Sequence, residues 1–133
     1  MEIDDIISLS KVRLERAKEF LDDAHDALEK EKYRTVANRS YYAVFHAMRA
    51  VLAFNNFDTK SHKGVISEFR RVYIKTGVFS KELSEMITNL FEIRLNSDYE
   101  DFYIVVKQDV RDQYSNAEKF IQEIEKYLKE KYK

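Results

Sequence analysis

Residues 33–54 read YRTVANRSYYAVFHAMRAVLAF, and this stretch decides the fold. Its apolar positions recur at helical spacing and leave few positions for an open polar face, as expected of a helix buried on several sides. Ala43 and Ala47 let neighbouring backbones approach closely, while Tyr41 and Phe45 provide large contact areas. We therefore predict a central helix over residues 33–54 with other helices packed around it.

Four further stretches show the apolar spacing of amphipathic helices. They run from about residue 4 to 30, 59 to 77, 80 to 98 and 107 to 132, with an irregular stretch around residue 101. Ser61 or Thr59 is the expected cap of the third helix, and Gly77 is its expected end. Ser80 is the expected cap of the fourth helix, which we predict to stop at Asn96-Ser97-Asp98 because such residues compete with the helical backbone for hydrogen bonds.

The composition favours long helices in a single domain. The 133 residues include two Gly and no Pro, so few residues that typically form turns interrupt the helices. The chain is 44% hydrophobic and 35% charged, which suffices for one buried core with a solvated surface. We therefore predict one all-α domain that spans residues 1–133.

Net charge and cysteine content restrict the function classes. A formal net charge of -1 gives no overall attraction to phosphate backbones, so a nucleic-acid site would have to be local. The absence of Cys removes disulfides, thiolate catalysis and thiolate metal sites. No apolar run approaches the roughly 20 residues of a membrane span, and residues 1–5 lack the basic start of a signal peptide, so we expect a cytoplasmic protein without membrane contact.

Arg39, Tyr42 and His46 lie on one stripe of the central helix. Seven residues make nearly two turns, so Arg39 and His46 point within about 20° of each other around the axis. A guanidinium, a phenol and an imidazole can together bind phosphate and move protons, which makes Arg39 and His46 the candidate catalytic residues. The alternative is structural: Arg39 pairs with a neighbouring acid and His46 donates a buried hydrogen bond.

Two other stretches contribute candidate binding residues. Ser61-His62-Lys63-Gly64 opens a helix, where unpaired amide donors beside His62 and Lys63 can hold an anion; the alternative is an ordinary capped surface helix. Arg94 and Asp98 are four residues apart, which allows an ion pair if the helix continues that far. Otherwise Asp98 and Tyr99 fix the turn that follows.

Other kinds of site are not expected. Asp22, His25 and Asp26 share one helix face, but a single helix offers an incomplete metal shell. No Ser stands in a nucleophile elbow, and neither Gly stands in a nucleotide-binding fingerprint. The sequence therefore predicts neither a metal site nor a cofactor.

Three separated motifs together resemble the HEPN domain family, in particular its small stand-alone prokaryotic proteins. They are ANRSYYAVFHA at residues 37–47, SHKG at residues 61–64 and RLNSDY at residues 94–99. The resemblance covers most of the chain, and the order and spacing of the three motifs are more specific than any one alone. It implies an up-and-down bundle of four or five helices that forms a homodimer and pairs with a minimal nucleotidyltransferase in a toxin-antitoxin-like system.

The resemblance also implies where ribonuclease chemistry would lie. Active HEPN ribonucleases resemble one another in an Arg that is followed, after about four to six residues, by a His near the end of a late helix, and this pair cleaves RNA without a metal. Arg94 matches that Arg, but no His follows it, and Asp98-Tyr99 stand at the end of the motif. Arg39 and His46 have the same Arg-to-His spacing, but they lie on the second helix, and they form the alternative site.

These observations leave three functions open. In the first, the chain is a nucleotide- or RNA-associated component of the toxin-antitoxin-like pair, and its binding residues are Arg39, Tyr42, His46, His62, Lys63, Arg94, Asp98 and Tyr99. The second is a metal-independent ribonuclease with His46 or His62 as the acid-base group, and the third is a structural dimeric module. Nine Tyr and nine Phe exceed the need of one small core, so we predict a dimer that buries the surplus aromatic surface.

Overall fold

The computed structural model describes residues 2–99 and 107–133, except for the side chain of Tyr99. Its α-helices are α1 (Ile3–Glu29), α2 (Tyr33–Leu52), α3 (His62–Phe69), α4 (Lys81–Tyr99) and α5 (Lys107–Lys131). A 3-10 helix, η1 (Ala53–Asn55), follows α2, and a π-helix, η2 (Arg70–Ile74), follows α3. No strand occurs within the described residues, and the all-α prediction is confirmed.

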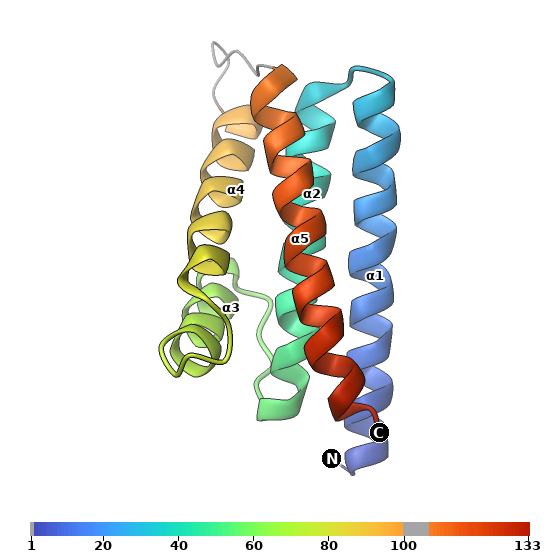
Figure 1. Ribbon diagram of the computed structural model, residues 1–133, viewed down its shortest axis with the longest axis vertical. Helices are drawn as coiled ribbons and strands as arrows, with labels where there is room; N and C mark the ends of the chain where they lie inside the picture. The colour runs from blue at the N-terminus through green and yellow to red at the C-terminus, as the bar shows by residue number, and fades with distance from the viewer. Residues whose placement is uncertain (1, 100–106) are drawn as a thin grey trace.

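The four long helices run alternately up and down. Figure 1 shows α1 and α4 ascending, α2 and α5 descending, and the short α3 beside the lower parts of α2 and α4. The two chain ends therefore lie at the same end of the bundle. This is the up-and-down bundle that the family resemblance implies. The irregular stretch predicted around residue 101 lies outside the described residues.

The central helix is α2, as its sequence predicts. It packs against α1, α3, α4 and α5, and most of its side chains are buried. Ala43 and Ala47 are fully buried where neighbouring backbones come close, and Tyr41 and Met48 fill the larger spaces between them. Burying one side chain of the size of Met48 contributes about 1.5–3 kcal/mol, so this helix organises the core.

Local sequence sets the helix ends near the middle of the chain. The Ser61 side chain accepts a hydrogen bond from the backbone N–H of Gly64 at 3.2 Å, so the predicted cap of α3 is confirmed. Gly77 has a φ of 83°, and its N–H donates to the Ile74 carbonyl at 3.0 Å, which ends this helical segment where the sequence predicts. The predicted end of the central helix at Phe54 is wrong by two residues, because the chain tightens into η1 after Leu52.

The π-helix η2 continues α3. Its backbone N–H of Lys75 donates to the Arg70 carbonyl at 2.8 Å, one residue more than an α-helical bond spans. This wider turn lets neighbouring side chains reach different helices. Arg70 turns towards α4, where its Nη2 donates to the Thr88 hydroxyl at 2.5 Å, and Tyr73 donates to Asn55 Oδ1, also at 2.5 Å.

The predicted stop of the fourth helix at Asn96-Ser97-Asp98 is wrong, because α4 continues to Tyr99. Two contacts explain the extra turn. Asp98 Oδ2 lies 3.1 Å from Arg94 Nε, and this ion pair offsets the unfavourable position of an acid at the helix C-terminus. Arg34 of α2 donates from Nη1 to the Ser97 carbonyl, which satisfies a helix-end acceptor.

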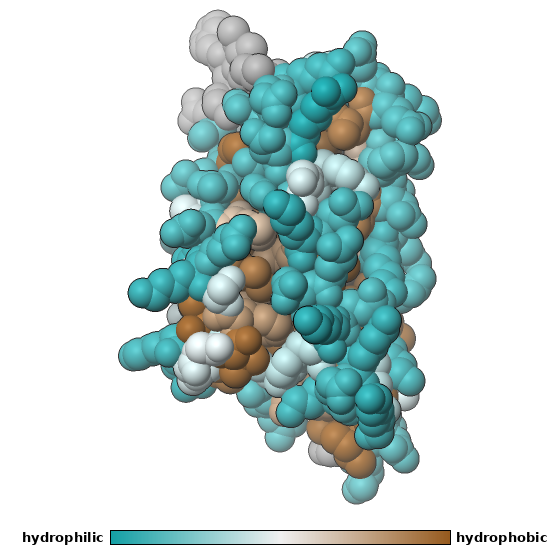
Figure 2. All heavy atoms as spheres, in the orientation of Figure 1, coloured by the Kyte–Doolittle hydropathy of each residue, from teal (hydrophilic) through white to brown (hydrophobic). Residues whose placement is uncertain are grey.

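The surface around α5 is largely polar. Figure 2 shows hydrophilic side chains over most of this view, with apolar atoms exposed towards α3 and α4 and at the lower end. The large apolar side chains that are exposed within the described residues are Ile3, Val12 and Val78, which lie on α1 and in the turn before α4. None of the described helices combines the length and hydropathy that crossing a membrane requires.

Candidate functional site

Arg94 lies at the centre of a group of polar side chains between α2 and α4. Its Nη2 donates to the Tyr42 hydroxyl at 3.0 Å, and its Nε lies 3.1 Å from Asp98 Oδ2. Its guanidinium carbon lies 5.3 Å from the ring centroids of both Tyr41 and Tyr42, within the range of cation–π attraction. The Arg94 side chain is only 11% exposed, so these contacts fix its direction. The predicted Arg94–Asp98 pair is therefore present.

Arg39 joins the same group through Asn38. Its Nη1 donates to Asn38 Oδ1 at 2.6 Å, and Asn38 Nδ2 donates to Asp98 Oδ2 at 3.3 Å. We call Asn38, Arg39, Tyr42, Arg94 and Asp98 the Arg94 cluster. Among residues 2–99 and 107–133, the group that accepts a hydrogen bond from Arg39 is the neutral amide of Asn38, so pairing of Arg39 with a neighbouring acid is not confirmed.

A hollow of about 290 Å³ lies on the Arg39 side of the Arg94 cluster. It is lined by Arg34, Thr35, Asn38, Arg39 and Asp98. Arg34 and Arg39 carry two positive charges at its wall, and the Asp98 carboxylate is already paired with Arg94. Among the described residues, Arg34 and Arg39 line this hollow with Asp98, and Arg94 pairs with Asp98 beside it, so these four side chains together carry positive charge in a protein with a formal net charge of -1.

His62, the first residue of α3, lies beside the Arg94 cluster. Its Nδ1 shares a hydrogen bond of 2.6 Å with the Tyr41 hydroxyl, and its ring stacks on Phe45 with centroids 4.4 Å apart. Its ring also meets the Tyr42 ring edge to face at 5.7 Å. Burial lowers the pKa of His62, and the nearby charge of Arg94 lowers it further. His62 is therefore largely neutral at pH 7, with part of its ring accessible.

The loop that leads to His62 is tied to α1 and α2 by Asp58. Asp58 Oδ1 lies 3.1 Å from Arg13 Nη2 and 3.3 Å from Arg49 Nη2, and Arg13 Nη1 also donates to the Arg49 carbonyl at 3.1 Å. Arg13 is buried and Asp58 is mostly exposed, so the carboxylate folds down onto a buried guanidinium. These contacts position the start of α3 over α2.

His46 lies deeper than the Arg94 cluster and is only 8% exposed. Its ring is parallel to Phe20 of α1, with centroids 5.1 Å apart, and the Arg39 guanidinium carbon lies 5.8 Å from the same Phe20 ring. Burial, followed by the charges of Arg16, Arg49, Arg13 and His62, lowers the pKa of His46 to about 4. The predicted buried hydrogen bond from His46 is not confirmed, because its Nδ1 has no partner within the described residues.

The remaining predicted binding residues are Lys63 and Tyr99. Lys63 is exposed and lines a separate groove between α3 and α4. Tyr99 is the last residue of α4, and its side chain lies outside what is described. The structure thus brings Arg39, Tyr42, Arg94 and Asp98 together, and His62 lies beside them. His46 is buried deeper than this group.

Three residues of this site were missed from the sequence: Arg34, Asn38 and Tyr41. Arg34, Asn38 and Tyr42 follow one another at intervals of four, so they share one face of α2, and this spacing could have revealed the first two. Tyr41 gave no signal, because its apolar ring is indistinguishable in sequence from a core residue.

One group of side chains with metal-ligand chemistry lies elsewhere, on α1. Ligand atoms of His25, Asp26 and Glu29 come within 4.8 Å of one another, and all three residues are exposed. They differ in one member from the set of Asp22, His25 and Asp26 considered from the sequence. Like that set, they come from a single helix face and would give an incomplete metal shell.

Known proteins share both the sequence pattern and the fold. The HEPN domain family model matches residues 10–127. A UPF0332 protein of Thermotoga maritima is 36% identical over 115 residues, covering 86% of this chain and 87% of that protein. A Methanocaldococcus jannaschii protein named "Putative toxin MJ0605" is 32% identical over 117 residues, covering 88% and 87% respectively.

A solved structure shows the same fold at low sequence identity. The crystal structure of TT1696 from Thermus thermophilus superposes with a TM-score of 0.76 at 15% identity, covering 88% of this chain and 96% of that one. The helical arrangement is therefore shared beyond close relatives. The family match spans nearly the whole chain and includes all three motifs quoted from the sequence, so the predicted resemblance is confirmed. The chain belongs to the HEPN domain family.

Proposed function

We propose that this chain is the RNA- or nucleotide-binding, toxin-like member of a toxin-antitoxin-like pair, with a minimal nucleotidyltransferase as its partner. Two relatives carry toxin in their names, which supports the toxin-like role. The observation that carries the proposal is the hollow that Arg34 and Arg39 line together with Asp98, the carboxylate that pairs with the neighbouring Arg94. Guanidinium groups bind phosphate oxygens in a fixed fork geometry, so this hollow suits a phosphodiester.

His62 adds a neutral hydrogen-bond donor to the proposed site. Tyr41 is fully buried, and burial raises the pKa of its hydroxyl, so the hydroxyl keeps its proton and needs an acceptor. His62 Nδ1 is the acceptor within reach at 2.6 Å. The neutral ring then carries its own proton on Nε2, which can donate to a phosphate or ribose oxygen.

Metal-independent ribonuclease activity is the second candidate. It is favoured by the closeness of His62 and Arg94, which both contact Tyr41 and Tyr42 and so pair an imidazole with a guanidinium in space. This candidate requires the opposite tautomer of His62, in which Nδ1 donates to the Tyr41 hydroxyl and Nε2 takes the proton of the ribose 2′-hydroxyl. The 2′-oxygen attacks phosphorus, and the 5′-oxygen leaves with a proton from water. His46 suits this step less well, since it is buried and its pKa is lowered to about 4.

Binding is tested with pure protein and a fluorescent single-stranded RNA of about 12 nucleotides, by anisotropy at two salt concentrations. Arg39→Gln should weaken binding about fivefold or more and flatten the salt dependence, because one phosphate contact is lost. Arg111→Gln is the matched control, since Arg111 is exposed on α5 and does not line the hollow. Absence of RNA and nucleotide binding, or an equal loss in both variants, would overturn the proposal.

Cleavage is tested separately, in the presence of a metal chelator. If the second candidate holds, wild-type protein produces 2′,3′-cyclic phosphate ends, His62→Gln does not, and His25→Gln does. His25 is the matched control because it is an exposed histidine on α1. If binding alone holds, no variant cleaves RNA, and His62→Gln only weakens the anisotropy signal.

The partner and the dimer are part of the same proposal. Expression of this chain should slow growth of a host cell, and co-expression of a minimal nucleotidyltransferase should relieve the effect. Sedimentation should give a dimer, because half-buried aromatic rings outside the proposed RNA site, such as Phe54, Phe57 and Tyr127, offer surface that a second copy can cover. A monomer at every protein concentration would contradict the dimer and leave the RNA-binding test unaffected.

A further inference from the structure

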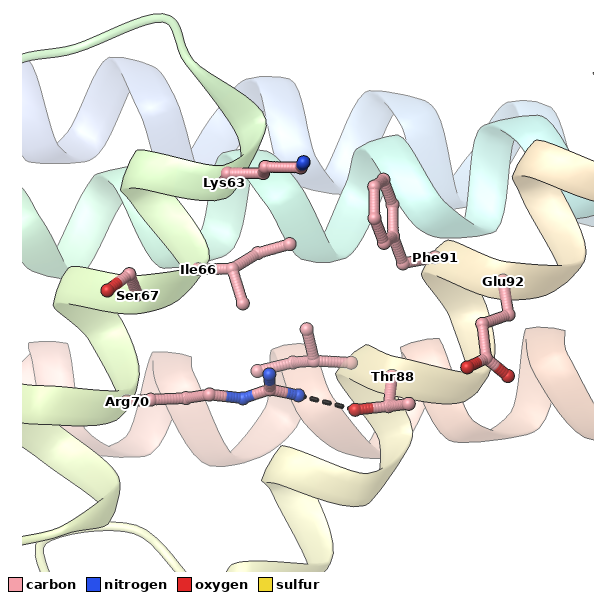
Figure 3. Close-up of a pocket in the computed structure, with 8 residues that line it drawn as sticks. Lys63, Ile66, Ser67, Arg70, Thr88, Phe91 and Glu92 are labelled. Carbon is pink, nitrogen blue, oxygen red and sulfur yellow. Dashed lines mark hydrogen bonds between the residues drawn. The ribbon is translucent and has the colours of Figure 1, made fainter.

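A groove of about 410 Å³ runs between α3 and α4, next to the Arg94 cluster. Figure 3 shows its two walls: Lys63, Ile66, Ser67 and Arg70 from the α3 side, and Ile87, Thr88, Phe91 and Glu92 from α4. Ile66 and Ile87 are buried and form an apolar floor, and the Phe91 ring is half-buried beside them. The volume lies in the range of small-ligand sites, and the lining combines an apolar floor with a few polar groups.

The groove carries positive charge that no carboxylate neutralises within the described residues. Arg70 donates from Nη2 to the Ser84 carbonyl at 3.0 Å and to the Thr88 hydroxyl at 2.5 Å, and both acceptors are neutral. Its Nε is buried without a hydrogen-bond partner in the described part of the chain. Lys63 lines the same groove and has no ion pair among residues 2–99 and 107–133. Arg70 is thus held in place by contacts that leave its charge available to an anion.

Glu92 lies at the other end of the groove from Arg70, as Figure 3 shows. The groove is therefore cationic at one end, apolar in the middle and acidic at the other. A mononucleotide has matching chemistry: a phosphate, a flat ring system and, in adenine, cytosine and guanine, an exocyclic amino group that donates to a carboxylate. Inorganic phosphate alone would leave the apolar floor and Glu92 unused.

The groove also continues the proposed RNA site. Lys63 follows His62 directly in the chain, so one turn of α3 faces both regions. Phe91 lies one helical turn before Arg94 on α4, and its ring centroid is 5.5 Å from that of Tyr41, which bonds His62. A single strand held at the Arg94 cluster can therefore extend past His62 into the groove.

We infer that the α3–α4 groove is a nucleotide subsite for the same single-stranded RNA, with phosphate at Lys63 and Arg70, a base beside Phe91, and Glu92 as the acceptor for a base amino group. This inference rests on the proposed RNA-binding function. It adds a base preference to that function, because adenine, cytosine and guanine carry an exocyclic amino group that can donate to a carboxylate and uracil carries none. Aromatic and guanidinium surfaces tolerate any base, so Glu92 is the group that discriminates.

The test compares binding of labelled oligoadenylate, oligocytidylate and oligouridylate by anisotropy, using the full chain. Wild-type protein should prefer the first two, and Glu92→Gln should reduce that preference by about threefold or more. Lys63→Gln should weaken all three about three- to fivefold, while its matched control Lys60→Gln, which changes the same charge in the exposed loop before α3, should not. Photocrosslinking with an oligoadenylate that carries 8-azidoadenosine should label peptides that contain Phe91 or Thr88.

The possible outcomes distinguish the groove subsite from the RNA-binding proposal. If Lys63→Gln matches Lys60→Gln, Glu92→Gln changes no preference, and Arg39→Gln still weakens binding, the groove subsite is wrong and the RNA-binding proposal stands. If wild-type protein binds no RNA, both are wrong. If an acidic, leucine-containing peptide perturbs the amides of Ser67 and Thr88 in NMR spectra while RNA does not, the groove receives a protein segment, and the nucleotide subsite is overturned.

Discussion

The Tyr41 hydroxyl lies 2.6 Å from His62 Nδ1 and joins the middle of α2 to the first residue of α3. Twenty-one residues separate the two positions in the chain, and the connecting loop is held down at Asp58 by Arg13 and Arg49. This hydrogen bond does two things. It satisfies a buried phenol, and it selects which nitrogen of the imidazole carries the proton.

Tyr41→Phe should therefore change both stability and tautomer. We expect a loss of about 1 kcal/mol in the free energy of unfolding, because one buried hydrogen bond disappears. The Nδ1 nitrogen of His62 should then become partly protonated, which ¹⁵N NMR of histidine side chains reports directly. Tyr42→Phe is the control, since the Tyr42 hydroxyl bonds Arg94 instead. An unchanged His62 spectrum in Tyr41→Phe would rule out this hydrogen bond.

Asp98→Asn should strengthen RNA binding while it weakens the fold. The substitution removes a carboxylate that lies beside Arg94 and lines the same hollow as Arg34 and Arg39, so we expect affinity for the RNA of the binding assay to rise about threefold at low salt, and less at high salt. The Asp98 side chain is 25% exposed, so loss of the ion pair should cost no more than about 1 kcal/mol of unfolding free energy. Weaker RNA binding by a well-folded variant would contradict the assigned charge balance.

The low pKa of His46, about 4, predicts a loss of stability in acid. The folded state disfavours the imidazolium, whereas the unfolded chain takes up this proton below its usual pKa of about 6.5. Stability is therefore fully retained above pH 6.5 and falls between about 6.5 and 4, by about 3 kcal/mol at most. Urea unfolding across this range measures the slope.

His46→Phe supplies the comparison for that slope. A phenyl ring keeps the stacking on Phe20 and has no proton to bind, so the variant should show a shallower loss of stability between pH 6.5 and 4. His62 and the carboxylates titrate in both proteins and cancel in the difference. Parallel curves for the two proteins would show that His46 titrates normally.

Gly77→Ala should destabilise the turn between η2 and α4. Gly77 has a φ of 83°, and a Cβ placed there meets nothing within 4 Å, so the expected cost of about 1 kcal/mol is backbone strain rather than crowding. Gly77→Asn should cost less, because Asn adopts this conformation more readily. Thermal unfolding of the two variants gives the comparison, and equal melting temperatures for Ala and wild type would contradict the strain.

The features predicted well from sequence are those set by neighbouring residues. The central helix follows from apolar spacing within α2, and the Ser61 cap and the Gly77 end follow from side chains or backbone freedom within a few residues. The family followed from motifs whose order along the chain is visible directly.

The features predicted poorly depend on contacts between distant segments. The fourth helix continues through Asn96-Ser97-Asp98 in part because Arg34, some sixty residues earlier, reaches the Ser97 carbonyl. His46 shares its helical stripe with Arg39 as expected, but Phe20 of α1 covers its ring and separates it from the accessible side chains. Spacing along one helix cannot reveal which neighbour covers a side chain.

The number of residues in the π-helix η2 determines the direction in which the side chains that follow it point. Deleting one residue within Arg70–Ile74 would restore four-residue hydrogen bonding and leave α3 unchanged up to Phe69. It would also rotate the following residues about the helix axis. The contact of Arg70 with Thr88 and the contact of Tyr73 with Asn55 could then no longer form together. A change of chain length in this segment would thus redirect the wall that faces α4 and also move Tyr73, which is buried in the core, so the shape of the groove and the packing of the bundle depend on the same extra residue.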